Sequence, residues 1–555
     1  MPWIPNRPAI PSFYLYRVRL PNKSLKKRKV CRENYVSSIR RFQLSHALNP
    51  DSAGGKLAIR NEVNLNWPVD SRVGTGCEGL DDILNGGFPR GRLYLIEGDP
   101  GAGKTTLALQ FSLDGVKKGE RVLYITLSES RSELVHAAES HGLSLDQIEI
   151  VELLPNESDL LPEQQYTVFH PAEVELSDRM LRIVKEVQRL RPERLVIDAL
   201  SELRMLAKDP LRYRRQILSL KDFMADQECT VLLLDDRSSR EPDLQLHSVV
   251  HGVLSMDRVP REYGKTRRQI EIVKLRGGPY SEGFHDYAIR TGGVVVFPRL
   301  VAADSRSEQA PEPVSSGIAE LDALTGGGLD RGTSTLLIGP AGCGKTSIAL
   351  QWAATAARRG ERCAFFSFEE GPNTMMMRAA GLGIDIRPHI ANGKIAIQPV
   401  DPAEMSPGEL VALVQQHVEN ENVRMVVLDS LNGYLQSMPG EQFLAVHLHE
   451  LLAYLSNRGV LTLMVLAQAG TIGSPLQSAV DVSYLADNIL LLRYFETHGE
   501  VRQAISTIKR RSGSHEHTIR ELKLGPDRIH IGRPLRDFQG VLTGTPTFLG
   551  GSKES

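Results

Sequence analysis

The chain has 555 residues, of which 41% are hydrophobic and 24% charged, and its 66 Lys and Arg nearly balance its 67 Asp and Glu. This composition is typical of a folded globular protein and excludes collagen-like, mainly disordered and disulfide-rich chains. The sequence has no run of about 20 apolar residues, so we expect no membrane-spanning helix. None of the five cysteines has Cys-x-x-Cys spacing, which argues against a zinc site and favours a reducing, cytoplasmic location.

Residues 1–65 are predicted to form a basic arm without a sustained helix or strand pattern. The first 60 residues carry 13 Lys and Arg against two acidic residues, a net charge of +11. Because the whole chain carries −1, the remainder carries −12. The arm is either a solvated tail or an electrostatic anchor for nucleic acid or anionic lipid.

Apolar strands and helical patterns alternate over residues 66–301, the first predicted domain. Continuous apolar runs suit parallel strands that are buried on both faces. The predicted strands are 93–97, 122–126, 195–197 and 231–234, and a helical pattern covers 105–118.

The same order of elements recurs after a polar, Pro-containing linker at 302–313. The second domain, 314–548, has predicted strands at 335–338, 363–366, 425–428 and 461–466 and a helical pattern at 346–359, and the tail is 549–555. The repeat is ungapped between 86–110 and 327–351. We therefore predict two tandem α/β domains, each a mostly parallel sheet with helices on both faces.

Each domain carries Gly-x4-Gly-Lys-Thr between a strand and a helix, the context in which this motif binds phosphate. Its glycines let backbone N–H groups converge on phosphate oxygens at a helix N-terminus, the lysine reaches the β- and γ-phosphates, and the threonine binds Mg²⁺. The alternative is a Gly-rich turn with a capping Thr. The predicted ATP-binding residues are Gly98, Gly101, Ala102, Gly103, Lys104, Thr105 and Thr106 in the first domain and Gly339, Gly342, Cys343, Gly344, Lys345, Thr346 and Ser347 in the second.

A strand ends in Asp at similar distances beyond both loops, in LVIDALS and VVLDSLN. A carboxylate at this end of a strand would face Mg²⁺ across the phosphate site, although it could instead cap the next helix. The predicted Mg²⁺ ligands are therefore Thr105, Asp198, Thr346 and Asp429.

ATP hydrolysis also needs a carboxylate that orients the attacking water. The second domain has Glu369-Glu370 after its second strand, where the first has Ser128-Glu129. If the first of these positions is the base, the first domain binds ATP but hydrolyses it slowly. The alternative is that these are solvated loop charges. The predicted catalytic residues are Glu369, Glu370, Glu129, Lys345 and Lys104.

A Lys-x-Arg pair follows a late strand in each domain, Lys274 and Arg276 in the first and Lys509 and Arg511 in the second. Such a pair could stabilise the γ-phosphate of a neighbouring subunit, as an arginine finger does. The alternative is an ordinary polar strand end.

These motifs, present twice, resemble the KaiC-like family of tandem RecA-like P-loop ATPases. The resemblance covers about residues 70–548 and includes GLDDILNGGFPRG, GIAELDALTGGGLDRG, RYFETHGEVRQAISTIKRR and LTGTPT. It implies two RecA-like domains that bind ATP·Mg²⁺ at subunit interfaces of a double-ringed hexamer. It also implies that Glu369 and Glu370 are the catalytic pair and that the Lys-x-Arg residues contact the neighbour's nucleotide.

The clock members of this family phosphorylate an adjacent Ser-Thr pair, and the matching positions here are Ser483 and Tyr484. This leaves Ser483 as a candidate single phosphosite, with Tyr484 expected to be a core aromatic. Those members also have a longer C-terminal tail that an activator binds, so we expect no KaiA-type partner. A KaiB-like protein, or a sensor kinase with its response regulator, is the partner that the resemblance implies.

The sequence therefore favours an ATP-hydrolysing signalling protein with candidate serine autokinase activity. One alternative is a RadA- or RecA-like DNA-dependent ATPase, which the basic arm supports but the acidic body and the lack of a basic, aromatic-rich loop oppose. We expect neither DNA nor a membrane as partner. The other alternative is a nucleotide-gated scaffold with negligible turnover, which Ser128 supports for the first domain.

Overall fold

The computed structural model describes residues 72–154, 171–207, 209–237, 244–261, 263–301, 312–436, 444–468, 482–542 and 547–549. The predicted basic arm, 1–65, and most of the predicted linker lie outside these residues. Within them, no helix combines the length and the apolar character needed to cross a membrane.

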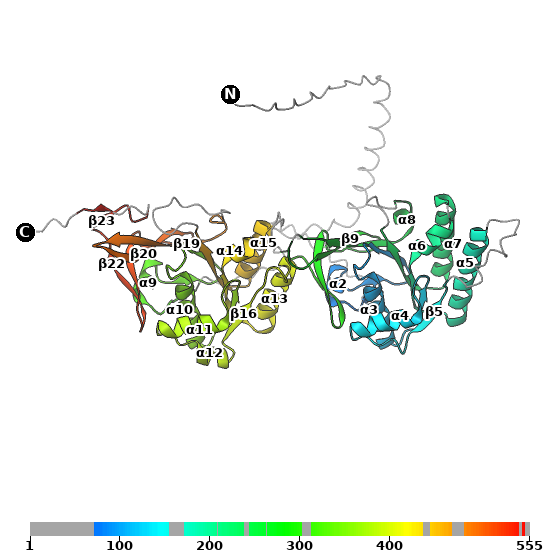
Figure 1. The fold of residues 1–555 in the computed structure, drawn as a ribbon, viewed down its shortest axis with the longest axis horizontal. Helices are drawn as coiled ribbons and strands as arrows, with labels where there is room; N and C mark the ends of the chain where they lie inside the picture. Colours follow the sequence, from blue (N-terminus) through cyan, green and yellow to red (C-terminus); the bar gives the residue numbers. More distant parts are fainter. Residues whose placement is uncertain are drawn as a thin grey trace, which may run out of the picture. The chain divides into compact units, whose positions relative to one another are not determined.

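The first repeat is built on a nine-stranded sheet with the order β11-β10-β9-β8-β3-β7-β6-β4-β5 (Figure 1). The six strands from β8 to β5 are parallel, and β9 to β11 extend the sheet in antiparallel fashion. The bounds are β3 (Leu93–Gly98), β4 (Val122–Thr126), β5 (Glu149–Glu152), β6 (Arg194–Asp198), β7 (Thr230–Asp236), β8 (Gly252–Val259), β9 (Arg267–Leu275), β10 (Phe284–Arg290) and β11 (Gly293–Phe297).

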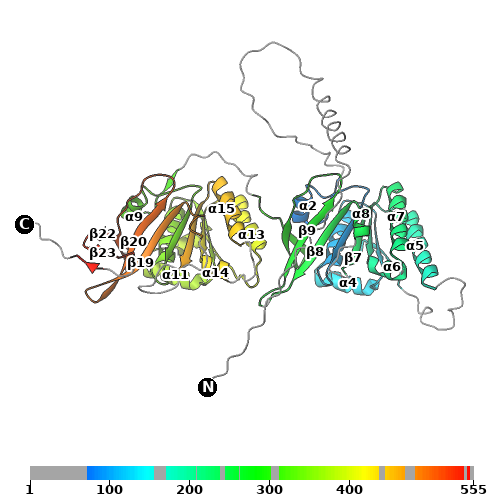
Figure 2. The same ribbon diagram turned by 90° about the horizontal axis from the view of Figure 1, so that it is seen from above.

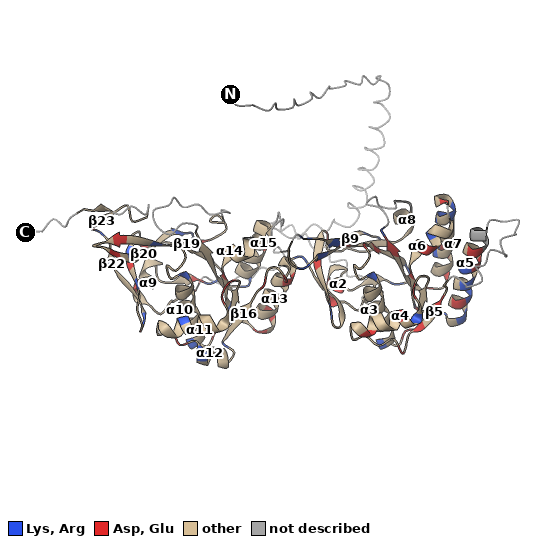
Figure 3. Ribbon diagram, viewed as in Figure 1, with Lys and Arg blue, Asp and Glu red and all other residues tan. Residues whose placement is uncertain are grey.

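Helices cover both faces of this sheet because its central strands are apolar on both sides: every residue of β3, β4 and β6 is buried. One face packs against α2 (Glu78–Ile83), α3 (Lys104–Lys117) and α4 (Arg131–Ser140). The other packs against α5 (Pro171–Leu190), α6 (Leu200–Ala207), α7 (Pro210–Asp226) and α8 (Leu244–Val249). Leu176, Ile183 and Val187 of α5 are buried, and its other side carries the mixed charges seen in Figure 3.

The second repeat has the same plan, with the sheet order β16-β15-β17-β18-β14-β19-β20-β21-β22. Strands β16 to β19 are parallel and β20 to β22 antiparallel. The bounds are β14 (Ser334–Gly339), β15 (Arg362–Ser367), β16 (Ile395–Pro399), β17 (Val423–Asp429), β18 (Leu461–Ala467), β19 (Asn488–Thr497), β20 (Glu500–Arg510), β21 (Arg520–Leu524) and β22 (Ile529–Pro534).

Its helices again divide between the two faces of the sheet (Figure 2). One face packs against α9 (Ala319–Leu324), α10 (Lys345–Arg358), α11 (Pro372–Gly381) and α12 (Arg387–Ala391). The other packs against α13 (Pro407–Asn420), α14 (Leu431–Gln436) and α15 (Leu444–Asn457).

Three two-stranded sheets complete the described fold. They pair β1 (Arg72–Val73) with β2 (Phe88–Pro89), β12 (Pro313–Val314) with β13 (Leu329–Asp330), and β23 (Phe538–Gln539) with β24 (Thr547–Phe548).

The predicted fold class is confirmed: each repeat is an α/β domain with a mostly parallel sheet. All eight predicted strands lie within observed strands, and the two predicted helices match α3 and α10 to within one residue at each end. Two of the antiparallel strands, β9 and β20, match the late strands that the sequence predicts, but their position beside the parallel strands is seen only in the folded sheet.

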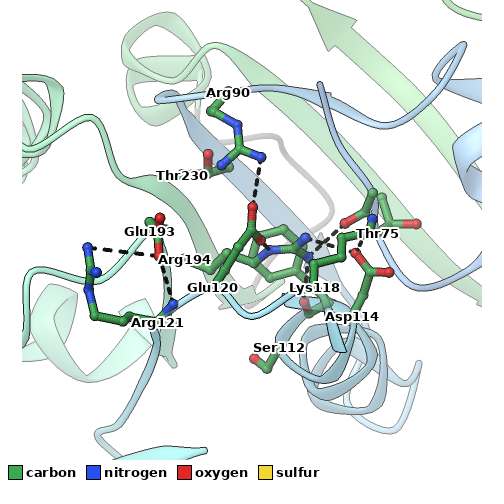
Figure 4. A network of polar contacts seen from close by, with 12 residues as sticks. Thr75, Arg90, Ser112, Asp114, Lys118, Glu120, Arg121, Glu193, Arg194 and Thr230 are labelled. Atoms are coloured by element: carbon green, nitrogen blue, oxygen red, sulfur yellow. Dashed lines mark hydrogen bonds and ion pairs between the residues drawn. The ribbon is translucent and has the colours of Figure 1, made fainter. Parts of the chain in front are cut away.

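A buried ion network lies at the start of β6 in the first repeat and joins this strand to the C-terminal part of α3 and the residues after it (Figure 4). The Arg194 side chain is fully buried; its Nε donates to Glu120 at 2.5 Å and its Nη2 to Asp114 at 2.8 Å. Lys118 and Arg90 pair with the same two carboxylates, each at 2.7 Å. The network therefore has cations on both sides of each acid, which a buried charge requires.

Candidate active sites

Both phosphate loops lie at the carboxyl edge of their sheets, near the middle of the strand order. In the first repeat β3 ends at Gly98, which pairs with Asp236 at the end of β7. Asp198 at the end of β6 pairs in turn with Thr126 at the end of β4. The ends of β3, β7, β6 and β4 thus form a row, and this row brings the phosphate loop and the acidic residues together.

The loop glycines are required by the backbone. Gly103 and Gly344 have φ of 98° and 100°, a left-handed conformation that L-residues with a Cβ rarely adopt. A Cβ on Gly98 or Gly339 would lie 2.1 or 2.4 Å from a carbonyl oxygen of the neighbouring strand. The other predicted residues of the loops and first helical turns are Gly101, Ala102 and Thr106, and Gly342, Cys343 and Ser347.

Lys104 and Lys345 are buried, at 7% and 6% exposure, and fold back over their own loops. The Nζ of Lys104 donates to two loop carbonyls, each at 3.0 Å, and that of Lys345 to the equivalent carbonyls at 2.9 and 2.7 Å. Each ammonium is thereby held inside the curve of its loop, where phosphate would bind. Lys104 has a further partner, Asp236, whose Oδ1 lies 2.7 Å from its Nζ.

The predicted Mg²⁺ ligands are adjacent in both repeats. The Thr105 hydroxyl donates to Asp198 Oδ2 at 2.9 Å, and the Thr346 hydroxyl donates to Asp429. A hydroxyl beside a carboxylate is a hard oxygen pair that suits Mg²⁺ when phosphate and water complete the octahedron. Within the described part of the chain no group of three or more His, Cys, Asp or Glu could hold a metal ion.

Glu369 and Glu370 lie at the second site rather than free in solvent. Ser430, next to Asp429, donates from Oγ to Glu369 Oε1 at 2.5 Å, and Arg378 Nη2 lies 3.1 Å from Glu370 Oε1. The pKa of Asp429 is raised to about 6, chiefly by burial; the charges of Glu369 and Glu370 add to this rise, whereas the hydrogen bond from Thr346 and the charge of Arg378 oppose it. These charges therefore share one electrostatic environment with the Mg²⁺ ligand.

The first site differs at the same place. Ser128 is exposed and supplies a hydroxyl where the second site has the carboxylate of Glu369, whereas Glu129 is present. Burial raises the pKa of Glu129, and the nearby charge of Asp198 adds to the effect. The buried Tyr124 hydroxyl donates to Asp198 Oδ2 at 2.7 Å, a contact that sequence reasoning missed.

Asp236, Ser430 and Arg378 were also missed. Asp236 ends a strand just as Asp198 does, so the signal was present, but only the sheet order shows that it lies next to the phosphate loop. Ser430 directly follows Asp429, which the sequence predicts as a Mg²⁺ ligand. Arg378 lies on α11 without a motif around it, and only the folded chain brings it to the loop of Lys345.

The structure does not bring the Lys-x-Arg residues to the site of their own chain. Lys274 and Arg276 flank Leu275, which pairs with Gly252 at the start of β8, whereas Gly98 pairs with Met256. Gly252 and Met256 are four residues apart on β8, or about 13 Å at ~3.3 Å per residue. The Lys-x-Arg residues and the phosphate loop therefore lie at opposite ends of the strands. In the second repeat Lys509 and Arg511 donate to carbonyls just before β19, the equivalent edge.

Ser483 lies at this same edge, where its carbonyl accepts a bond of 3.1 Å from Lys509 Nζ. Tyr484 was expected in the core, but this prediction is wrong: its side chain is 56% exposed. The apolar neighbours Val482, Leu485 and Ala486 fill the core instead, and the turn between them directs Tyr484 outward.

Comparison with known proteins agrees with this geometry. The family model described as "ATPase: KaiC" matches residues 73–301 and again residues 314–536. The circadian clock protein KaiC3 of Synechocystis sp. (strain ATCC 27184 / PCC 6803 / Kazusa) is 26% identical over 491 residues, which cover 87% of this chain and 96% of the relative. The circadian clock oscillator protein KaiC of Parathermosynechococcus lividus is 27% identical over 492 residues, covering 85% and 87%. With two phosphate loops in matching repeats and both repeats matched by the model, the chain belongs to the KaiC ATPase family.

Proposed function

We propose that this KaiC-family ATPase binds ATP with Mg²⁺ at both loops and hydrolyses it mainly at the second. The observation that carries this division is the difference between Glu369 and Ser128. The second site has a carboxylate, held by Ser430, beside its Mg²⁺ ligand, and the first has a hydroxyl in its place.

In the proposed reaction Glu369 accepts a hydrogen bond from water and directs it at the γ-phosphorus of ATP. The water oxygen bonds to that phosphorus as the bond to the β-γ bridging oxygen breaks, and Glu369 takes a proton from the water, which yields ADP and inorganic phosphate. Lys345 leaves its loop carbonyls to balance charge on the β- and γ-phosphates. Thr346 and Asp429 would hold Mg²⁺, which would supply further charge neutralisation when bound.

We propose that a neighbouring copy of the chain completes each site. The Lys-x-Arg residues lie at the sheet edge opposite the phosphate loop, so within one chain they cannot reach its nucleotide. A head-to-tail ring places this edge of one subunit against the loop of the next, and rings of this kind close when the rotation allows. The assembly proposed is a hexameric double ring with one tier for each repeat, as the resemblance implies.

Ser483 is proposed as a phosphoryl acceptor in the same arrangement. It precedes β19, and Asp487 there bonds to Ser334 at the start of β14, whereas the phosphate loop follows Gly339 at the end of that strand. The two ends of β14 are five residues apart, or about 16 Å at about 3.3 Å per residue. Ser483 is therefore too far from the nucleotide of its own chain, and the phosphoryl donor would be the neighbour's ATP. Lys509, bonded to the carbonyl of Ser483, would accompany it into that site.

The output of this cycle is proposed to be a nucleotide-dependent change of ring surface that a signalling partner reads. The relatives named above are circadian clock proteins, which supports a timing or switching role. A KaiB-like protein or a sensor kinase with its response regulator is the class of partner proposed.

The test is to incubate the full chain with ATP labelled on the γ-phosphate and Mg²⁺ and to follow released phosphate and protein-bound label together. Wild type should release phosphate, and label should be bound by wild type and lost in Ser483→Ala. Release without label would contradict the phosphosite and leave the ATPase. Absence of both would contradict the proposed function.

A further inference from the structure

The first site contains an ion pair that has no equivalent among the described residues of the second. Asp236 Oδ1 lies 2.7 Å from the Nζ of Lys104, which is the cation expected to reach the phosphates of the nucleotide. The lysine side chain is 8% exposed and that of the aspartate 45%, so the carboxylate approaches from the open side of the loop.

The strand order fixes this position. Asp236 is the last residue of β7 and pairs with Gly98, the first glycine of the phosphate loop. On its other side β6 ends with Asp198. Asp236 therefore lies beside the loop, two residues beyond the level of Asp198, and its charge acts on both Lys104 and the predicted Mg²⁺ ligand.

Other acidic groups face the same space. Glu129 follows β4 and Asp198 ends β6, and the charge of Asp236 contributes to the raised pKa of both, after the larger effect of burial. The charge of Lys104 acts on Asp236 and Asp198, and an added phosphate would compete with Asp236 for the lysine.

The second repeat provides the comparison within the same chain. Gly339 pairs there with Ala467, so the position of Asp236 carries a methyl group. Lys345 has loop carbonyls and the Cys343 sulfur, at 3.8 Å, as its partners. In addition Arg378 lies at the loop, where the first repeat has Ala137 at the equivalent place on α4.

We propose that Asp236 determines nucleotide selection at the first site by lowering its affinity for a nucleoside triphosphate relative to a diphosphate. A diphosphate presents its β-phosphate to Lys104 while the lysine keeps Asp236 as partner. A triphosphate places its γ-phosphate on the side of Asp236, which displaces the carboxylate from the ammonium and brings like charges within a few ångströms. At a partly exposed site, a repulsion of this kind changes a binding constant by about tenfold.

This selection rests on the proposed function, because it requires that the first loop binds nucleotide. With this selection, the nucleotide bound at the first site follows the ratio of ATP to ADP. The second site has Ala467 in place of Asp236 and favours the triphosphate. The first repeat is then suited to sensing that ratio rather than to rapid turnover.

The test uses the full chain with Lys345→Ala to disable the second site. Affinities for ADP and for a non-hydrolysable ATP analogue, each with Mg²⁺, are measured by calorimetry for this background, for Asp236→Asn and for Asp257→Asn. Asp257 is a matched control because it pairs with Arg237 at 2.6 Å instead of with the lysine. Asp236→Asn should raise the analogue-to-ADP affinity ratio about tenfold, and the control should change it less than about twofold.

The reciprocal variant, Ala467→Asp in a Lys104→Ala background, should lower the same ratio at the second site. An unchanged ratio in Asp236→Asn, or an equal gain for both nucleotides, overturns the proposal. If the background protein binds neither nucleotide, the proposed function of the first site fails instead.

Discussion

Replacing Arg194 by Met should destabilise the first repeat and leave the second unaffected. The Arg194 side chain is fully buried, donates to Asp114 and Glu120, and also donates to the carbonyls of Gly74 and Phe111 at 2.9 and 2.7 Å. Methionine fills much of the volume but supplies none of these donors.

The size of the expected loss of stability depends on the ion pairs that remain after the substitution. Removing one partner of a buried ion pair costs about 3–5 kcal/mol because the other charge stays buried. Here Lys118 still pairs with Asp114 and Arg90 with Glu120, so we expect the lower end, about 3 kcal/mol.

The second repeat shows how the chain can fill the same place without this arginine. Met425 occupies the equivalent strand position, since it pairs with Cys363 as Arg194 pairs with Val122. Thr355 and Arg359, at the places of Asp114 and Lys118, donate to the carbonyls of the chain segment before α9. The triple variant Arg194→Met/Asp114→Thr/Lys118→Arg should therefore recover at least half of the lost stability.

Hydrogen exchange measured by mass spectrometry separates the two repeats. Peptides from β3 and β6 should exchange about 100-fold faster in Arg194→Met, which corresponds to about 3 kcal/mol, and peptides from β14 and β17 serve as internal control. An acceleration below about fivefold in β3 and β6, or an equal acceleration in both repeats, would refute the reasoning.

Three further predictions concern the sites. The pKa of Asp429 in the nucleotide-free site is raised to about 6, chiefly by burial. Because its ionised form would bind Mg²⁺, phosphate release at limiting Mg²⁺ should fall as the pH drops through about 6. Its contribution to the stability of the nucleotide-free repeat has the opposite sign, since it is greatest below about pH 4 and is lost as the pH rises through about 6; titrating both activity and urea unfolding checks both signs. Lys509→Ala and Lys345→Ala chains should each be inactive. An equal mixture should regain about a quarter of wild-type phosphate release, because in about a quarter of the interfaces one subunit supplies an intact phosphate loop and its neighbour an intact Lys509. No recovery after re-assembly would argue against sites shared between subunits. Tyr124→Phe removes the 2.7 Å hydrogen bond to Asp198 and should weaken Mg²⁺-dependent nucleotide binding at the first site by about three- to tenfold. The affinity is measured in the Lys345→Ala background, and unchanged binding would show that the hydroxyl is not needed.

The sequence was sufficient for the features that lie in contiguous segments. The phosphate loops, the strands that precede them and the helices that follow are each encoded within about 25 residues, and the repeat confirms them by occurring twice. The buried strands were recognisable because both of their faces are apolar.

Features that depend on neighbouring strands were not accessible in the same way. Asp236 follows Gly98 by more than a hundred residues, and only the insertion of β7 next to β3 brings it to Lys104. Arg378 reaches the second loop through the packing of α11. The prediction that Tyr484 lies in the core is wrong because its burial depends on how the turn before β19 orients the side chain. The residue type alone does not determine that orientation.

The central claim, that the second repeat is the main site of hydrolysis, is tested most directly by steady-state phosphate release from Glu369→Gln and Lys104→Ala. We predict that Glu369→Gln loses most of the release, by at least about 100-fold, because the amide cannot accept a proton from water. Lys104→Ala should retain release from those chains that still assemble. Full activity in Glu369→Gln together with none in Lys104→Ala would contradict the claim and place the chemistry in the first repeat.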